Sequence, residues 1–215
     1  MDKMEPETTF IDKLKHRLQA ITKGMAKKAE IPSYHDKRAI LLGYKDQFQI
    51  GTLVETGTFL GDTVEFFRHK LGMVYSIELS EELAAKAAQR FQGVANVRII
   101  QGDSGVVLAN LVKEISGPAL FWLDGHYSSE FYVNDEYIRT ARSDKDTPIM
   151  KELQILLNDQ RQHVILIDDA RLFNGVGDYP SLKAIRDLVK HSKFPYHLSV
   201  HKDIINIIPA HELVK

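Results

Sequence analysis

The stretch TLVETGTFLGDT, residues 52–63, decides the fold class of this chain. Its first five residues form an apolar run of strand length, and Gly57 and Gly61 follow. Glycines at a strand–helix junction allow a sharp turn and a close approach of the backbone to a ligand. A dinucleotide motif, G-x-G-x-x-G, starting at Gly57 would need glycine where Phe59 and Asp62 stand. The stretch therefore predicts a strand–helix turn that binds a ligand other than a pyrophosphate, with a tight turn without ligand as the alternative.

Outward from this stretch, apolar runs of strand length alternate with amphipathic helical patterns. This alternation predicts βα units and a doubly wound, Rossmann-like α/β sheet that is parallel and buried on both faces. Helical patterns include Ile149–Leu157 and Leu182–Val189. The predicted parallel strands are Thr52–Thr56, Val74–Leu79, Val97–Gln101, Ala119–Asp124 and His163–Asp168.

The end of the chain follows a different pattern. Two strand patterns, Tyr196–His201 and Ile204–Ile208, are separated by Lys202 and Asp203 alone. Two residues are too few for a helical crossover, so the two segments should pair as an antiparallel hairpin. The predicted sheet therefore has seven strands, five of them parallel and the last two forming a C-terminal antiparallel hairpin.

The region before the sheet predicts helices. A basic amphipathic helix is expected over Thr9–Ala29, and a second helix over Asp36–Phe48. The basic face is interpreted as solvated, with a membrane-surface or partner contact as the alternative. We expect residues 1–48 to form a helical extension that packs on the core, and residues 49–215 to form the main part of what is a single domain overall.

Composition limits the function classes. The 215 residues carry 28 Lys and Arg against 29 Asp and Glu, a formal net charge of −1, so no global positive field would attract nucleic acid. The chain has no cysteine, which excludes disulfides, thiolate metal sites and a cysteine nucleophile. No apolar run is long enough to span a bilayer, and the acidic start lacks the apolar core of a secretory signal. A cytoplasmic enzyme is the default expectation.

Acidic residues stand at the ends of successive predicted strands. Glu55 ends the first strand, Glu78 the second, Asp103 with Ser104 follows the third, and Asp124 ends the fourth. An acid such as Glu78 at the end of a second strand can bind both ribose hydroxyls of a nucleoside. A lone strand-end acid is more often a helix cap or a solvated carboxylate, but four along one sheet edge favour a nucleoside-containing ligand.

This arrangement resembles the class I S-adenosylmethionine-dependent methyltransferases over about residues 52–209. The loop E-T-G-T-F-L-G departs from the richer E/D-x-G-x-G-x-G of many members and is similar to that of the metal-dependent catechol-type and sugar O-methyltransferases, E-x-G-x-x-x-G. The resemblance implies a cofactor, S-adenosylmethionine, with the glycine loop at its methionine end, Glu78 at its ribose and Asp103 and Ser104 at its adenine. The implied cofactor-binding residues are Glu55, Thr56, Gly57, Thr58, Gly61, Thr63, Glu78, Leu79, Asp103, Ser104 and Asp124.

Three carboxylates are expected at the same sheet edge, because adjacent strands end at Asp124 and at Asp168-Asp169. Such carboxylates repel one another, and a hard divalent cation with oxygen ligands relieves that repulsion. The resemblance to catechol-type enzymes likewise implies Mg²⁺ or another divalent cation held by Asp124, Asp168 and Asp169. The alternative is that Asp168 or Asp169 caps the following turn and Asp124 contacts only the cofactor.

Methyl transfer from a sulfonium requires a nucleophilic acceptor, so a hydroxyl needs a base or a metal ion that lowers its pKa. His126 is the candidate base because the pKa of histidine lies near neutrality, with a plain hydrogen-bonding role as the alternative. In the catechol-type enzymes a lysine stands three residues after the first metal acid, and here that place is Tyr127. The expected catalytic residues are His126, Asp124 and Tyr127.

The polar stretch Ser128–Thr147 stands where acceptor-binding loops are expected, and it is interpreted as a lid or as a solvated excursion. The leading hypothesis is an O-methyltransferase that acts on a hydroxyl of a sugar or other small polar acceptor with divalent metal assistance. The alternatives are a nicotinamide-dependent oxidoreductase and a non-catalytic cofactor-binding protein. A DNA base methyltransferase is disfavoured, because Leu123-Asp124-Gly125-His126 replaces the Asn/Asp-Pro-Pro-aromatic motif. A homodimer is left open.

Overall fold

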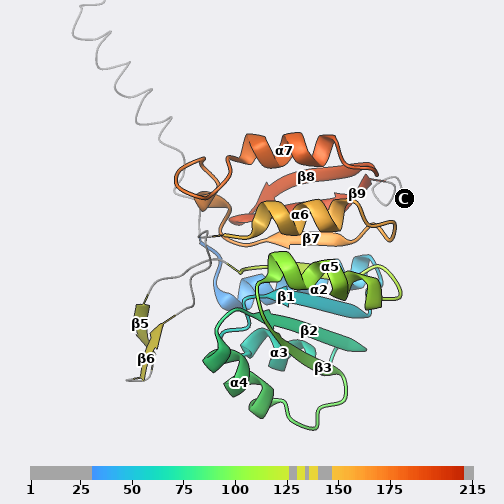
Figure 1. Cartoon of the computed structure of the whole chain (residues 1–215). Coiled ribbons are helices and arrows are strands. Elements are labelled where there is room, and N and C mark those ends of the chain that lie inside the picture. Colours follow the sequence, from blue (N-terminus) through green and yellow to red (C-terminus); the bar gives the residue numbers. More distant parts are fainter. Residues whose placement is uncertain (1–30, 126–129, 134–135, 140–146, 211–215) are drawn as a thin grey trace, which may run out of the picture. The chain divides into compact units, whose positions relative to one another are not determined.

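The computed structural model describes residues 31–125, 130–133, 136–139 and 147–210. Its centre is a seven-stranded sheet in the order β3-β2-β1-β4-β7-β9-β8 (Figure 1). The first five of these strands run parallel, and β9 and β8 run antiparallel to their neighbours. The strands are β1 Thr52–Thr56, β2 Met73–Glu78, β3 Val97–Gln101, β4 Leu120–Leu123, β7 Val164–Ile167, β8 Tyr196–His201 and β9 Ile204–Pro209. The predicted fold class and strand arrangement are confirmed.

Helices cover both faces of this sheet. In Figure 1, α5, α6 and α7 lie in front of the sheet and α2 and α3 lie behind it. The helices are α2 Tyr34–Gln47, α3 Asp62–Phe67, α4 Glu81–Arg90, α5 Ser104–Glu114, α6 Ile149–Leu157 and α7 Leu182–Lys190, with a short 3₁₀ helix, η1, at Ala170–Leu172. None of the helices in the described part of the chain is long and apolar enough to cross a membrane.

The central strands have apolar side chains on both faces. In β4, Phe121 and Leu123 belong to the core that packs against α5, α6 and α7, whereas Leu120 and Trp122 belong to the core on the side of α2 and α3. Successive side chains of a strand point to opposite faces, so a continuous apolar run fills both cores at once. This double burial fixes the register of the strands and therefore the position of the residues at their ends.

A tight turn closes the terminal hairpin. Lys202 and Asp203, the two residues between β8 and β9, have φ angles of 47° and 59°. Positive φ at both central residues is the signature of a type I′ turn, whose twist matches that of paired strands. The predicted hairpin is confirmed, and its turn brings Asp203 beside η1, where the Asp203 carbonyl accepts a hydrogen bond from the Ala170 amide at 2.7 Å.

The helix α2 and the sheet belong to one compact unit, and this unit begins at Pro32. Its N-terminus is a capping box in which Ser33 and Asp36 exchange hydrogen bonds between side chain and backbone. Leu41 is 1% exposed and packs in the core beneath the helix. The helix predicted over Thr9–Ala29 lies outside the described residues.

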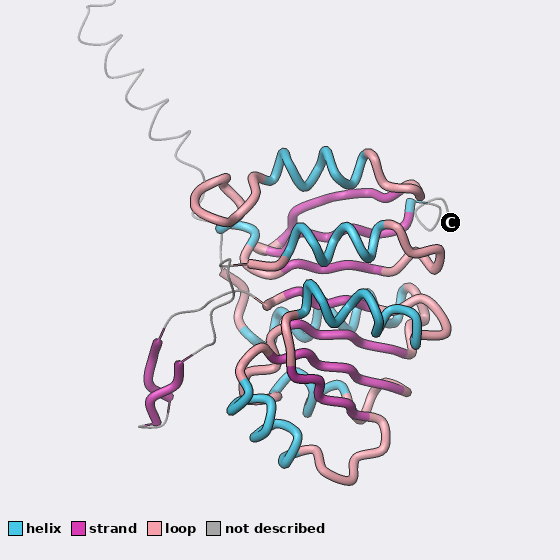
Figure 2. The backbone as a smooth tube through the Cα atoms, viewed as in Figure 1, coloured by secondary structure: helices cyan, strands magenta, loops and turns pink. Residues whose placement is uncertain are grey.

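The polar stretch after β4 contains two strands that we did not predict from the sequence. Two strands, β5 Glu130–Val133 and β6 Glu136–Arg139, pair antiparallel as a separate two-stranded sheet, coloured as strand in Figure 2. Each strand includes an aromatic and a β-branched residue, which favour extended backbone even in a polar segment. At least part of this stretch is therefore a hairpin.

Candidate active site

The two glycines of the β1–α3 turn are required by contacts within the chain. Gly57 has φ of +89°, and a Cβ atom there would lie 2.7 Å from the carbonyl oxygen of Asp124. Gly61 has φ of +80°, and a Cβ atom there would lie 2.7 Å from the ring of Phe91. L-residues with side chains rarely adopt such φ angles. The turn is therefore held tightly against the end of β4 and the end of α4.

A chain of buried polar side chains lies beneath this turn. Ser76 donates a hydrogen bond of 2.7 Å to the carboxylate of Glu55, and the hydroxyls of Ser76 and Thr58 lie 2.7 Å apart. Burial raises the pKa of Glu55 to about 8, against the opposing effect of its hydroxyl partners. Glu55, predicted to bind cofactor, thus supports the turn from below in this structure.

Glu78, at the end of β2, is fixed by backbone amides. Its Oε2 accepts a hydrogen bond from the Phe59 amide, and its Oε1 accepts one from the Ser80 amide, both at 2.9 Å. The carboxylate therefore joins the glycine turn to the start of α4. A carboxylate has further lone pairs beyond these two bonds, so it can still accept hydrogen bonds from a ligand.

The next strand end lies beside Glu78, because Glu78 pairs with Gln101 in the register of β2 and β3. Asp103 caps α5 by accepting a hydrogen bond of 2.8 Å from the Gly105 amide, and Ser104 is the first residue of that helix. Leu79 contributes its carbonyl, which accepts a hydrogen bond of 3.0 Å from the side chain of Gln101. The structure therefore brings the predicted ribose and adenine residues to neighbouring strand ends.

The helix α2 contributes two residues that the sequence reasoning missed. The hydroxyl of Tyr34 lies 3.0 Å from Oγ1 of Thr63, a predicted cofactor residue. Lys37 forms an ion pair and hydrogen bond with Oδ2 of Asp168. The burial of the ammonium is unfavourable, but its contact with Asp168 outweighs this and raises the pKa of Lys37. Nothing in the sequence near Lys37 indicates a partner 131 residues away.

Asp168 and Asp169 lie at the predicted sheet edge, and the positively charged side chains of Lys37 and Arg171 contact them there. Asp168 is 2% exposed, and Asp169 lies 3.9 Å from the Lys37 ammonium. Asp169 also accepts a hydrogen bond of 2.7 Å from Arg171. Arg171 in turn contacts Asp203 in the β8–β9 turn. Tertiary contact therefore brings a positive charge, that of Lys37 on α2, to the edge where the sequence predicted a divalent cation.

The predicted metal ligands do not fit a divalent cation in this arrangement. Among the residues that the structure describes, no group of three His, Cys, Asp or Glu side chains is placed to hold a metal ion. The backbones of Asp124 and Asp168 are neighbours, since the Asp168 amide donates to Leu123 next to Asp124. Lys37 binds the oxygen Oδ2 of Asp168, so its positive charge lies where a divalent cation would have to approach that oxygen.

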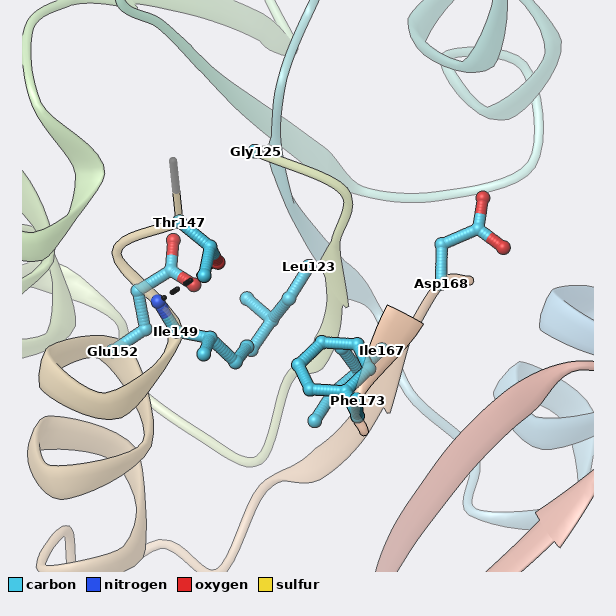
Figure 3. A pocket seen from close by; sticks show the side chains of 8 residues that line it. All are labelled: Leu123, Gly125, Thr147, Ile149, Glu152, Ile167, Asp168 and Phe173. Carbon is cyan, nitrogen blue, oxygen red and sulfur yellow. Dashed lines mark hydrogen bonds between the residues drawn. The ribbon is translucent and has the colours of Figure 1, made fainter. Parts of the chain in front are cut away.

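A pocket lies at the ends of β4 and β7, with a carboxyl group on each side of an apolar floor (Figure 3). Glu152 of α6 stands beside Thr147 on one side, and Asp168 stands on the other. Glu152 is 1% exposed, and its Oε1 has no hydrogen-bond partner among the described residues. The pocket is lined by Leu123, Gly125, Thr147, Ile149, Glu152, Ile167, Asp168 and Phe173.

Glu152 is a third functional candidate that the sequence reasoning missed. Burial raises the pKa of Glu152 to about 7, even though Ser104 and Thr56 favour its charged form. A buried acid with a shifted pKa in a pocket is typical of functional sites. A signal was present, because Glu152 lies between Ile149 and Leu153 on the apolar stripe of an amphipathic helix. The predicted catalytic residues His126 and Tyr127 lie outside the described residues.

Solved structures with the same fold are methyltransferases. The O-methyltransferase TomG from Streptomyces achromogenes, solved with S-adenosylmethionine, matches with a TM-score of 0.54 and 14% identity over 96% of this chain and 92% of its own. An O-methyltransferase from Bacillus cereus, solved with S-adenosylhomocysteine, matches with a TM-score of 0.53 and 16% identity over 94% and 92%. The methyltransferase PaMTH1 of Podospora anserina, also bound to S-adenosylhomocysteine, matches with a TM-score of 0.51 and 14% identity over 95% of this chain and 99% of its own.

At the level of sequence, no protein-family model and no curated protein matches the chain. The likeness to the solved structures nevertheless extends over nearly the whole length of both partners. The sheet of this chain ends in the reversed strand β9, which pairs antiparallel with β7 and β8. The chain therefore has the Rossmann-like fold of the class I methyltransferases.

Proposed function

We propose that this protein is an S-adenosylmethionine-dependent methyltransferase that methylates a hydroxyl on a sugar or other small polar acceptor. The observation that carries the proposal is the row of acids at one sheet edge, with the Glu78 carboxylate fixed by two backbone amides beside Asp103. The fold and the ligands named for the three solved neighbours support the same cofactor.

The donor groups of the site suit this cofactor. A fixed carboxylate at the end of β2 can accept hydrogen bonds from ribose hydroxyls, and polar groups at the start of α5 can bind an adenine edge. The Gly57 turn presents backbone at the ends of β1 and β4, beneath the position expected for the methionine part. When bound, S-adenosylmethionine supplies an electrophilic methyl group.

The described residues then act by positioning the acceptor. The pocket between Glu152 and Asp168 has carboxyl groups at both sides, which accept hydrogen bonds from hydroxyl or amine groups, over an apolar floor. Holding an acceptor oxygen in line with the methyl group contributes much of the rate enhancement of such a transfer. His126 stays our candidate for the base that removes the hydroxyl proton.

Calorimetry on the full chain tests the proposal. S-adenosylmethionine and S-adenosylhomocysteine should both bind and raise the melting temperature, since they bind the native state alone. NAD serves as the comparison ligand, because a nicotinamide oxidoreductase was the alternative. Binding of NAD with no binding of either adenosyl compound would overturn the assignment.

A further inference from the structure

Lys37 is the residue around which the acidic edge is organised. It lies on α2, between Tyr34 and Leu41, and its side chain is 19% exposed while that of Asp168 is 2% exposed. An ion pair that is this shielded from water interacts more strongly than a surface pair, because screening by solvent and salt is weaker. The contact joins α2 to the end of β7.

The backbone around Asp168 is adapted to this arrangement. The second oxygen of Asp168, Oδ1, accepts a hydrogen bond of 2.8 Å from the Asp169 amide. Asp169 has φ of +55°, an uncommon angle for a residue other than glycine, asparagine or aspartate. Its backbone turn leads into η1, where the Arg171 amide donates to Asp203 at 2.8 Å. Both oxygens of Asp168 are therefore engaged by groups of the chain itself.

We propose that Lys37 takes the place of the predicted divalent cation, so that the carboxylates of Asp168 and Asp169 are neutralised by the chain and no metal ion binds there. An ammonium group carries a fixed positive charge and three hydrogen-bond donors, and it has no need of a ligand shell. A Mg²⁺ ion would instead have to displace the ammonium and would be repelled by it at short range.

The consequence for the reaction rests on the proposed function. In methyl transfer the acceptor oxygen attacks the methyl carbon, the carbon–sulfur bond breaks with its electron pair going to sulfur, and the hydroxyl proton passes to a base. Lys37 is a positioning residue in this scheme, since it holds Asp168 at the edge of the acceptor pocket. Transfer should therefore proceed in the presence of a chelator.

Manganese binding tests the proposal without an acceptor. The metal-stripped full chain is titrated with Mn²⁺ and followed by electron paramagnetic resonance, and we expect no saturable site tighter than roughly 0.1 mM, the range of weak carboxylate sites. Lys37→Met keeps the length of the side chain and removes its charge, so Mn²⁺ should bind at least about tenfold more tightly than to wild type. Adding Asp168→Asn to that variant should abolish the gain.

The matched control is Lys45→Met, which removes a lysine from the same helix whose partner is Asp46, away from the acidic edge. It should leave Mn²⁺ binding as in wild type. A saturable wild-type site that Asp168→Asn removes would overturn the proposal, and this needs no Lys37 variant to fold. A folded Lys37→Met that binds Mn²⁺ no better than wild type would overturn it too. Failure to bind S-adenosylmethionine would instead contradict the proposed function and leave the manganese result standing.

Discussion

Gly57 and Asp124 touch backbone to backbone: a Cβ atom on Gly57 would lie 2.7 Å from the carbonyl oxygen of Asp124. The contact joins the ends of β1 and β4, which are neighbours in the sheet. Gly125 also lies close to β1, since a Cβ atom there would be 3.0 Å from the side-chain oxygen Oγ1 of Thr56. The glycine turn therefore cannot move without moving the strand that carries Asp124.

Gly57→Ala should destabilise the protein by about 2–4 kcal/mol, because it adds a backbone clash to the strain of a positive φ. Gly93→Ala is the matched control, since Gly93 also has positive φ, +79°, but nothing within 4 Å of its virtual Cβ. The free energy of unfolding of that control should fall by about 1 kcal/mol, from the strain of the positive φ alone. Urea denaturation measures both, and equal losses would show that the Asp124 contact is unimportant.

Glu78→Ala should weaken S-adenosylmethionine binding by about 1.5–3 kcal/mol, the usual worth of a hydrogen bond to a charged group. Glu81→Ala removes the same charge from the exposed start of α4 and should leave the affinity unchanged. Calorimetric titration of both variants decides the matter. Equal affinities for the two variants would mean that the fixed carboxylate does not touch the cofactor.

Glu152→Gln should stabilise the protein at high pH. Burial raises the pKa of Glu152 from 4.5 to about 7, so the folded state binds its proton more tightly than the unfolded state does. The stabilisation that protonated Glu152 gives the folded state is fully present below pH 4.5 and is lost as the pH rises through 7. As the pH rises from 5 to 8, the free energy of unfolding of the variant should therefore increase relative to that of wild type by roughly 2–3 kcal/mol.

Urea denaturation across this pH range measures the gain, with Glu81→Gln as the exposed control. The free energy of unfolding of the control should change with pH in the same way as that of wild type. A Glu152→Gln curve that also runs parallel to wild type would show that the Glu152 carboxyl is ionised at little cost, as expected for a solvated group.

His163 should make the protein sensitive to acid. The imidazole is fully buried, its Nδ1 accepts a hydrogen bond of 3.1 Å from the Ala119 amide, and burial lowers its pKa to about 4. The folded state holds it neutral, so stability is full above pH 6.5 and falls by roughly 2–3 kcal/mol as the pH drops from 6.5 towards 4. His163→Gln should reduce this slope, whereas the exposed His197→Gln should keep it. Identical slopes in all three proteins would refute the assignment.

The sequence by itself determined the sheet and the identity of most strand-end groups. The pattern predicted Thr52–Thr56, Val97–Gln101 and Tyr196–His201 at the residues observed, because short apolar or alternating runs of this length are typical of strands. The two-residue spacing before Ile204 likewise required a hairpin. Parallel strands carry their last residues to one edge, so Glu78, Asp103 and Asp124 could be placed there from order alone.

Tertiary structure alone decided what those groups touch. Lys37 reaches Asp168 across 131 residues, and no local rule of spacing links an α2 lysine to the end of β7. That contact places an ammonium group at the sheet edge where the sequence predicted a metal ion. Glu152 was visible as a polar interruption of an apolar stripe, yet its burial beside Ser104 and Thr56 depends on how α6 packs on the sheet. Charge pairing and desolvation are long-range properties of the packed chain, whereas periodicity is a local one.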